Sequence, residues 1–145
     1  MFWKKRNLVL IAGCGRLGAS LAGSLSETGE SVVVIDKDKT SFRRLPANFS
    51  GFQQVGDATS ADILEAAGIA EAAVVVAATK DDNCNCMIAQ IASRIYNVGE
   101  VYTRLHDPSL EKILAGYHIQ AIYPVRLSIQ EFQRLSGVHL PEESL

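Results

Sequence analysis

One glycine-rich stretch limits the possible folds of this chain more than any other feature: Gly13-Cys14-Gly15-Arg16-Leu17-Gly18. An apolar run, Leu8 to Ala12, precedes it, and residues 17–25 are small and apolar, as in a helix packed on a sheet. In a strand–loop–helix unit, the first glycine permits a tight turn, the second lets the backbone approach a diphosphate, and the third lets helix and strand pack closely. Glycines also form ordinary turns, but these flanking segments favour a phosphate site at a helix N-terminus.

The rest of the chain alternates between apolar runs and amphipathic segments. Ser31 to Asp36 is a continuous β-branched run, typical of a strand buried on both faces of a parallel sheet. The alternation predicts an α/β fold, a Rossmann-type doubly wound parallel sheet of six strands in the order 3-2-1-4-5-6, with helices on both faces. The expected strands cover residues 7–12, 31–36, 52–55, 73–78, 101–105 and 121–123, and the expected helices cover 15–28, 39–45, 60–67, 84–96, 108–115 and 125–135.

Local signals refine the expected helices. Thr59, followed by Asp62, resembles the start of a capping box, and Asp107 before Pro108 is typical of an N-cap and a first-turn proline. Apolar residues at helical spacing predict the core-facing sides of two helices, formed by Met87, Ile88, Ile91, Ala92 and Ile95 in one and by Leu110, Ile113 and Leu114 in the other.

Length and composition indicate a single globular unit. The 145 residues fit one domain, and a hydrophobic content of 48% is sufficient for a core. We expect a domain over residues 1–137 and a short C-terminal tail over 138–145. The net charge is −2, and acidic and basic residues are scattered along the chain, so the charge pattern does not indicate a protein that binds nucleic acid. The apolar runs are too short for a signal peptide or a membrane span, which predicts a cytoplasmic protein.

The ends of the predicted strands carry glycine or polar residues. In such a sheet the ligand lies beyond the carboxyl ends of the strands, so the glycine loop, Asp36-Lys37, residues 56–59 and residues 77–80 should meet at one crevice. Asp36 lies about 20 residues past the loop, where a carboxylate binds ribose hydroxyls and disfavours the 2′-phosphate of NADP. Asp57 is expected near the adenine, although a turn-forming or capping role explains that residue almost as well.

Arg16 lies inside the glycine loop, where a guanidinium beside the phosphates would add a charge-assisted pair of hydrogen bonds. This position favours a ligand with more negative charge than a dinucleotide, such as ATP or ADP. The alternative interpretation is a surface arginine.

The cysteines and histidines give little sign of chemistry. Three cysteines argue against a disulfide framework, and Cys84-Asn85-Cys86 lacks the second ligand pair of a zinc site. Cys14 is expected near a helix N-terminus, where the pKa of a thiol tends to fall; a redox role and a role as a small filler both fit it. His106, His118 and His139 have no evident catalytic partner, so neither a catalytic site nor a metal site is expected.

Several motifs together resemble the RCK (KTN, TrkA N-terminal) family. They are the glycine loop, Asp36, residues 56–59, the run Val74 to Asn83, and Arg104-Leu105-His106-Asp107-Pro108. The resemblance covers residues 7–137. It implies a non-catalytic regulatory domain that binds NAD(H) or an adenine nucleotide (ATP, ADP or AMP). The residues implied for this ligand are Gly13, Cys14, Gly15, Arg16, Leu17, Gly18, Asp36, Lys37, Asp57, Ala58 and Thr79.

The resemblance also implies partners and a place in the cell. Members of the family regulate potassium channels and potassium uptake systems, form dimers, and often assemble into rings beneath a membrane pore. We therefore expect a membrane transporter or channel subunit as partner, a homodimer or larger ring, and a location at the inner face of the plasma membrane. Many relatives carry a second, C-terminal ligand-binding lobe; residues 138–145 are too few for one, so effectors of that lobe are not expected to bind this stretch of chain.

Two other functions fit the same motifs. The chain could be the nucleotide-binding half of a small NAD-dependent dehydrogenase, although such an enzyme normally takes its proton-transfer group from a second domain. It could also be an assembly module with an empty pocket, an interpretation that the intact glycines and Asp36 disfavour.

Overall fold

The computed structural model describes residues 8–141. Six parallel strands form one sheet in the order β3-β2-β1-β4-β5-β6, which confirms the predicted fold and strand order. The expected start of the first strand at Asn7, the basic residues 1–6 and the last part of the tail lie outside the described residues. The strands are β1 (Leu8–Ala12), β2 (Ser31–Asp36), β3 (Phe52–Val55), β4 (Ala72–Ala77), β5 (Glu100–Arg104) and β6 (Ile119–Ile122).

Alternate residues of the central strands pack on opposite faces of the sheet. On one face, Val9 and Ile11 pack with residues of α1 (Arg16–Glu27) and of the 3-10 helix η1 (Lys39–Arg44). On the other face, Leu10 packs with residues of α2 (Ala61–Ala66) and α3 (Asp82–Gln90). Residues 9–12 of β1 are therefore fully buried on both sides, as expected for the middle of a parallel sheet.

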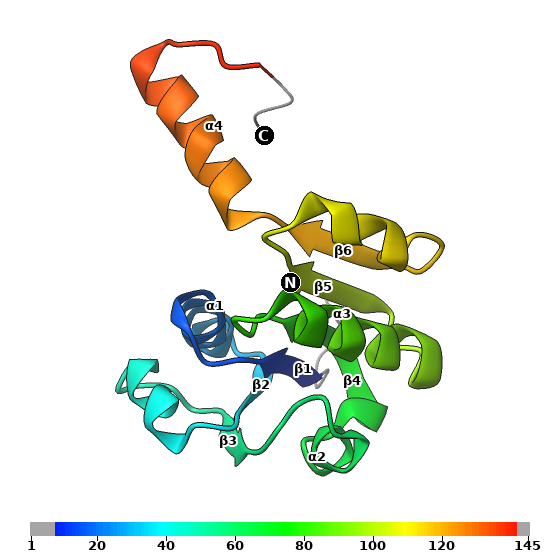
Figure 1. The fold of residues 1–145 in the computed structure, drawn as a ribbon. Coiled ribbons are helices and arrows are strands. Elements are labelled where there is room, and N and C mark those ends of the chain that lie inside the picture. The colour runs from blue at the N-terminus through cyan, green and yellow to red at the C-terminus, as the bar shows by residue number, and fades with distance from the viewer. Residues whose placement is uncertain (1–7, 142–145) are drawn as a thin grey trace.

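The remaining elements are short, apart from the last helix. They are the 3-10 helices η2 (Ile69–Glu71) and η4 (Pro108–Leu114), the π-helix η3 (Ile91–Ile95), and α4 (Pro124–Ser136). As predicted, Asp107 caps η4 by accepting a hydrogen bond from the Ser109 N–H. Figure 1 shows α4 extending away from the sheet, beyond the end of β6. The side chains of α4 are exposed or only partly buried.

Several predicted boundaries are wrong by one or two residues. The last strand covers Ile119–Ile122 because those residues pair with β5, while Tyr123 already occupies the N-cap position of α4. The helix expected to run to Tyr96 ends its α-helical part at Gln90 and continues as η3. Thr59 is not a helix cap: Ser60 holds the N-cap position of α2, and Thr59 donates its N–H and hydroxyl to Asp57.

Not every residue predicted for the core faces it. Ile88 and Ala92 are fully buried, whereas Met87 is 50% exposed and Ile95 is 70% exposed. Ile113 of η4 is also 45% exposed. The apolar spacing identified the helix but included positions at the margin of its buried side. The observed core face of the helix over residues 82–95 is therefore narrower than the sequence predicts.

Candidate functional site

A cavity of about 750 Å³ opens at the carboxyl ends of the central strands. It is lined by residues at or just after the ends of five strands: Gly13 and Gly15 after β1, Asp36 at the end of β2, Ala58 after β3, Lys80 after β4, and Arg104 at the end of β5. The expected convergence of the strand ends at one crevice is confirmed. A cavity of this size is typical of small-molecule and cofactor sites.

The structure separates the candidate ligand residues into two groups. Seven line the cavity: Gly13, Gly15, Asp36, Lys37, Asp57, Ala58 and Thr79. The other four, Cys14, Arg16, Leu17 and Gly18, are outside its lining. Gly18 is buried behind the loop, where a Cβ would collide with the carbonyl oxygen of Gly13. Arg16 is exposed in the first turn of α1, so its contact with phosphates stays a prediction.

The glycine loop is fixed between the ends of β2 and β4. Gly13 adopts φ +105°, donates its N–H to the Ile35 carbonyl at 2.7 Å, and lies against the backbone of Ala78. A Cβ at Gly13 would approach the Ala78 carbonyl oxygen to 2.5 Å, so only glycine fits this turn. Gly15, by contrast, has open space beside it and borders the cavity. The loop therefore presents bare backbone to a ligand, as the spacing predicts.

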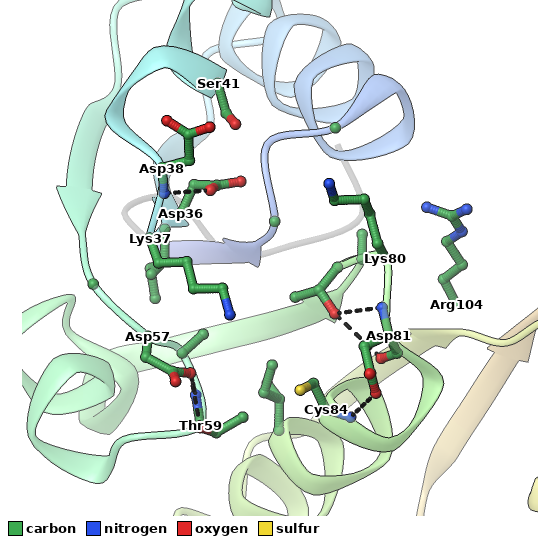
Figure 2. A pocket seen from close by; sticks show the side chains of 18 of the residues that line it. Asp36, Lys37, Asp38, Ser41, Asp57, Thr59, Lys80, Asp81, Cys84 and Arg104 are labelled. Atoms are coloured by element: carbon green, nitrogen blue, oxygen red, sulfur yellow. Dashed lines mark hydrogen bonds between the residues drawn. The ribbon is translucent and has the colours of Figure 1, made fainter.

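Asp36 joins β2 to this loop and also borders the cavity. Its Oδ2 accepts the backbone N–H of Cys14 at 2.8 Å, and its Oδ1 accepts the N–H of Asp38 at 2.8 Å (Figure 2). Each carboxylate oxygen keeps a further lone pair. Asp36 can thus orient the loop and accept hydroxyl groups from a ligand at the same time.

The other carboxylates of the cavity accept hydrogen bonds within their own loops. Asp38 accepts from Thr40. Figure 2 shows the other two contacts, in which Asp57 accepts from Thr59 and Asp81 accepts from the Cys84 N–H. The Thr59 N–H and hydroxyl lower the pKa of Asp57, and the Thr40 hydroxyl and N–H lower that of Asp38. The turn-forming role left open for Asp57 is therefore present, and its contact with adenine stays a prediction.

Five basic side chains also line the cavity: Lys37, Arg43, Arg44, Lys80 and Arg104. Within residues 8–141, the carboxylate contacts of basic side chains are the one between His106 and Asp82 and the ion pair between Arg134 and Glu131, so none of the five is paired with a carboxylate. Sequence reasoning named only Lys37 among them as a ligand residue. The positions of Lys80 and Arg104 near strand ends were the signal that could have identified those two.

Asn85 ties two walls of the cavity together, a role that sequence reasoning missed. Its fully buried side chain accepts the N–H and hydroxyl of Thr79 at 2.9 and 2.6 Å. Its amide nitrogen donates to the carbonyls of Thr79 and Arg104, both at 3.0 Å. One side chain thereby supplies hydrogen-bond partners to the polar groups of Thr79, in the loop after β4, and to the Arg104 carbonyl at the end of β5.

A second hydrogen-bonded group surrounds the end of β5. Asp82 accepts the backbone N–H groups of His106 and Asp107 at about 2.9 Å and the His106 Nδ1 at 3.1 Å. Nδ1 then carries the proton, so Nε2 of His106 accepts from Nη2 of Arg104 at 3.0 Å. Burial raises the pKa of Asp82, but these hydrogen bonds lower it more, and the carboxyl titrates below its usual range.

Arg104 also borders a second cavity, of about 430 Å³, between the end of β5 and α4. The residues of α4 and the tail that line it are Pro124, Val125, Ser128, Ile129, Phe132 and Leu140. The Nε atom of Arg104 is buried and has no hydrogen-bond partner within the described residues. This arginine is therefore shared by both cavities.

The cysteines carry no sign of reactivity. Cys14 is fully buried, and burial, followed by the nearby Asp36 charge, raises the pKa of its thiol. The expectation of a lowered pKa is wrong, because the thiol packs into the core beneath the loop. Within residues 8–141, no group of three or more acidic, histidine or cysteine side chains could hold a metal. No helix in that range has the length and apolar composition to cross a membrane.

Comparison with known proteins identifies the family. The TrkA-N domain family matches residues 9–124, which is most of the chain. The chain belongs to the TrkA-N domain family. The Trk system potassium uptake protein TrkA of Streptomyces coelicolor is 36% identical over 126 residues, which cover 87% of this chain and 56% of that relative. This TrkA-N chain thus spans little more than half the length of that protein.

Solved structures share the TrkA-N architecture. The C-terminal domain of Kef from Shewanella denitrificans, in its AMP-bound form, matches 89% of this chain and 81% of its own, with 26% identity and a TM-score of 0.68. The GsuK channel bound to NAD matches 91% of this chain and 23% of its own, with 21% identity and a TM-score of 0.76. The second likeness shows the fold alone.

Proposed function

We propose that this TrkA-N domain is a non-catalytic regulatory module of a potassium transport or channel system, and that it binds NAD(H) or an adenine nucleotide. The observation that carries the proposal is the cavity between the bare glycine loop and Asp36. Loop N–H groups at the start of α1 suit phosphates, and the Asp36 carboxylate suits a ribose diol. We propose Gly13, Gly15, Asp36, Lys37, Asp57, Ala58 and Thr79 as direct ligand contacts, with Cys14, Leu17 and Gly18 supporting the loop and Arg16 bordering the phosphates.

The relatives support a role in potassium transport. The curated relatives named TrkA belong to Trk potassium uptake systems, and the related Kef domain was solved with AMP. The module would act at the inner face of the membrane, through a transporter or channel subunit, as a homodimer or larger ring. Residues 1–137 would form the binding domain and 138–145 its tail. Ligand exchange can regulate a partner only if the ligand binds two conformations of the assembly with different affinity.

Calorimetric titration tests the binding function. The chain is titrated separately with NAD, NADH, ATP, ADP and AMP, and nicotinamide absorbance is followed for turnover. We expect at least one nucleotide to bind without turnover, and Asp36→Ala to lose most of that binding. Asp62→Ala, an exposed acidic residue of α2 outside the cavity, is the matched control and should bind normally. Equal binding by Asp36→Ala and the parent would contradict the proposed site, and nicotinamide oxidation would favour the dehydrogenase instead.

A further inference from the structure

The charges of the cavity are divided unequally between engaged acids and unpaired bases. Asp36, Asp38, Asp57 and Asp81 each accept at least one backbone N–H group. None of the five basic side chains that line the cavity forms an ion pair with a carboxylate within the described residues. The acids therefore serve the loops. Among the bases, Arg44 donates one hydrogen bond to the Cys14 carbonyl and Arg104 donates one to His106, but all five side chains keep further donors for an anionic ligand.

Two of these bases lie together on one side of the cavity. Parallel pairing places Ala77 of β4 beside Thr103 of β5. Lys80 lies in the loop after β4, and Arg104 is the last residue of the neighbouring β5. Figure 2 shows both side chains extending in the same direction from that side, whereas Lys37 lies across the cavity near Asp57. Asn85 fixes the two walls by its hydrogen bonds to Thr79 and to the Arg104 carbonyl.

The guanidinium of Arg104 is oriented but not neutralised. Nη2 donates to His106, whose opposite ring nitrogen is held by Asp82. The Nε atom is buried and has no partner within residues 8–141. A buried N–H without an acceptor is costly, and a phosphate oxygen would be a suitable acceptor.

The direction of a bound nucleotide follows from the fold. With the ribose at Asp36 and the first phosphates at the glycine loop, the rest of the ligand extends towards β4 and β5. We propose that Lys80 and Arg104 form a subsite for the terminal phosphates of a nucleoside polyphosphate. This inference rests on the proposed function and deepens it: the domain distinguishes ATP and ADP from AMP and NAD. The preference for ligands with more phosphate charge would then come from Lys80, after β4, and Arg104, at the end of β5, in addition to any contribution from Arg16 in the loop.

Parallel titrations with ATP, ADP, AMP and NAD, in one buffer free of divalent metal, test this subsite. The parent should bind ATP more tightly than AMP or NAD. Lys80→Met removes the charge and keeps a side chain of similar length. It should weaken ATP binding about tenfold, because charge-assisted hydrogen bonds are among the stronger ones, and it should leave AMP binding unchanged. Lys80→Arg keeps the charge and should retain the preference for ATP over AMP. Lys112→Met, an exposed lysine outside the cavity, is the matched control.

The outcomes separate the subsite from the nucleotide site itself. If AMP or NAD binds as tightly as ATP, or if Lys80→Met leaves the ratio of ATP to AMP affinity unchanged, the subsite is overturned while nucleotide binding stands. If no nucleotide binds, both proposals fail. Arg104→Lys keeps the charge but cannot present the same planar fork, so we expect a smaller loss of ATP affinity with AMP binding retained. An unchanged ATP affinity in that variant would remove Arg104 from the subsite.

Discussion

The Asp36 carboxylate and the Cys14 N–H are hydrogen-bonded at 2.8 Å across 22 residues of sequence. This contact attaches the glycine loop to the end of β2. Asp36 therefore has a structural task that is separate from any contact with a ligand.

Replacement of Asp36 should reduce stability as well as binding. In Asp36→Ala, the N–H groups of Cys14 and Asp38 lose their acceptor, and we expect the free energy of unfolding to fall by about 1–3 kcal/mol. Asp36→Asn keeps one acceptor oxygen and should recover part of this loss. Urea unfolding of the two variants and the parent measures the effect; equal stability of all three would show that the contact contributes nothing.

Two glycines of the loop should fail in different ways. Gly18→Ala places a Cβ against the Gly13 carbonyl, so this variant should be destabilised and should separate α1 from β1. Gly15→Ala has space for its Cβ and does not need positive φ, so it should unfold like the parent, yet the methyl group borders the cavity and should weaken phosphate binding. Thermal unfolding together with nucleotide titration distinguishes the two. A destabilised Gly15→Ala protein with normal binding would contradict the assigned roles.

The fully buried Asn85 amide should be essential to the cavity wall. Asn85→Asp removes both donated hydrogen bonds and turns a carboxylate towards the carbonyls of Thr79 and Arg104. Loss of such buried partners costs about 1–3 kcal/mol each, so this variant should be strongly destabilised near neutral pH. Asn83→Asp makes the same chemical change at an exposed position of α3 and serves as the control. Equal unfolding midpoints in urea would refute the bracing role.

Acid should weaken the fold through Asp82. The pKa of Asp82 lies below its ordinary value of 3.8 in the folded protein, so its contribution to stability is present above that value and is lost as pH falls through the folded pKa. The free energy of unfolding, measured from about pH 5 downward, should therefore decrease, and Asp82→Asn should show a shallower decrease. Asp38 and Asp57, whose pKa values are also lowered, account for part of the remaining slope. An identical slope in parent and variant would exclude Asp82 as a source.

The sheet was predictable because its signals are local. Continuous β-branched runs identify buried parallel strands, and the glycine spacing identifies the first turn and the strand order around it. The convergence of Gly13, Asp36 and Asp57 follows from that topology alone. The strand ends needed pairing partners for their definition, which is why β6 begins at Ile119 and not at Ala121.

Side-chain partners were less accessible to sequence reasoning. The spacing of Met87 and Ile88 predicts one helix face, but only the packing of α3 on the sheet decides that Ile88 is buried and Met87 is exposed. Nothing in the sequence pairs Asn85 with the Arg104 carbonyl, 19 residues away. Arg16 drew attention through its place in the loop. The strand ends place Lys80 and Arg104 near the crevice, but only the structure shows that both side chains line the same cavity.

Arg104 is common to the wall of the strand-end cavity and the wall of the cavity beneath α4. A ligand that draws this side chain to one side changes the shape offered on the other. Suppose that this ligand changes the affinity of a second molecule for the cavity beneath α4. The second molecule must then change the affinity of the first ligand by the same factor. The two cavities share the Arg104 side chain, so a ligand effect that passes through it would be measurable at both.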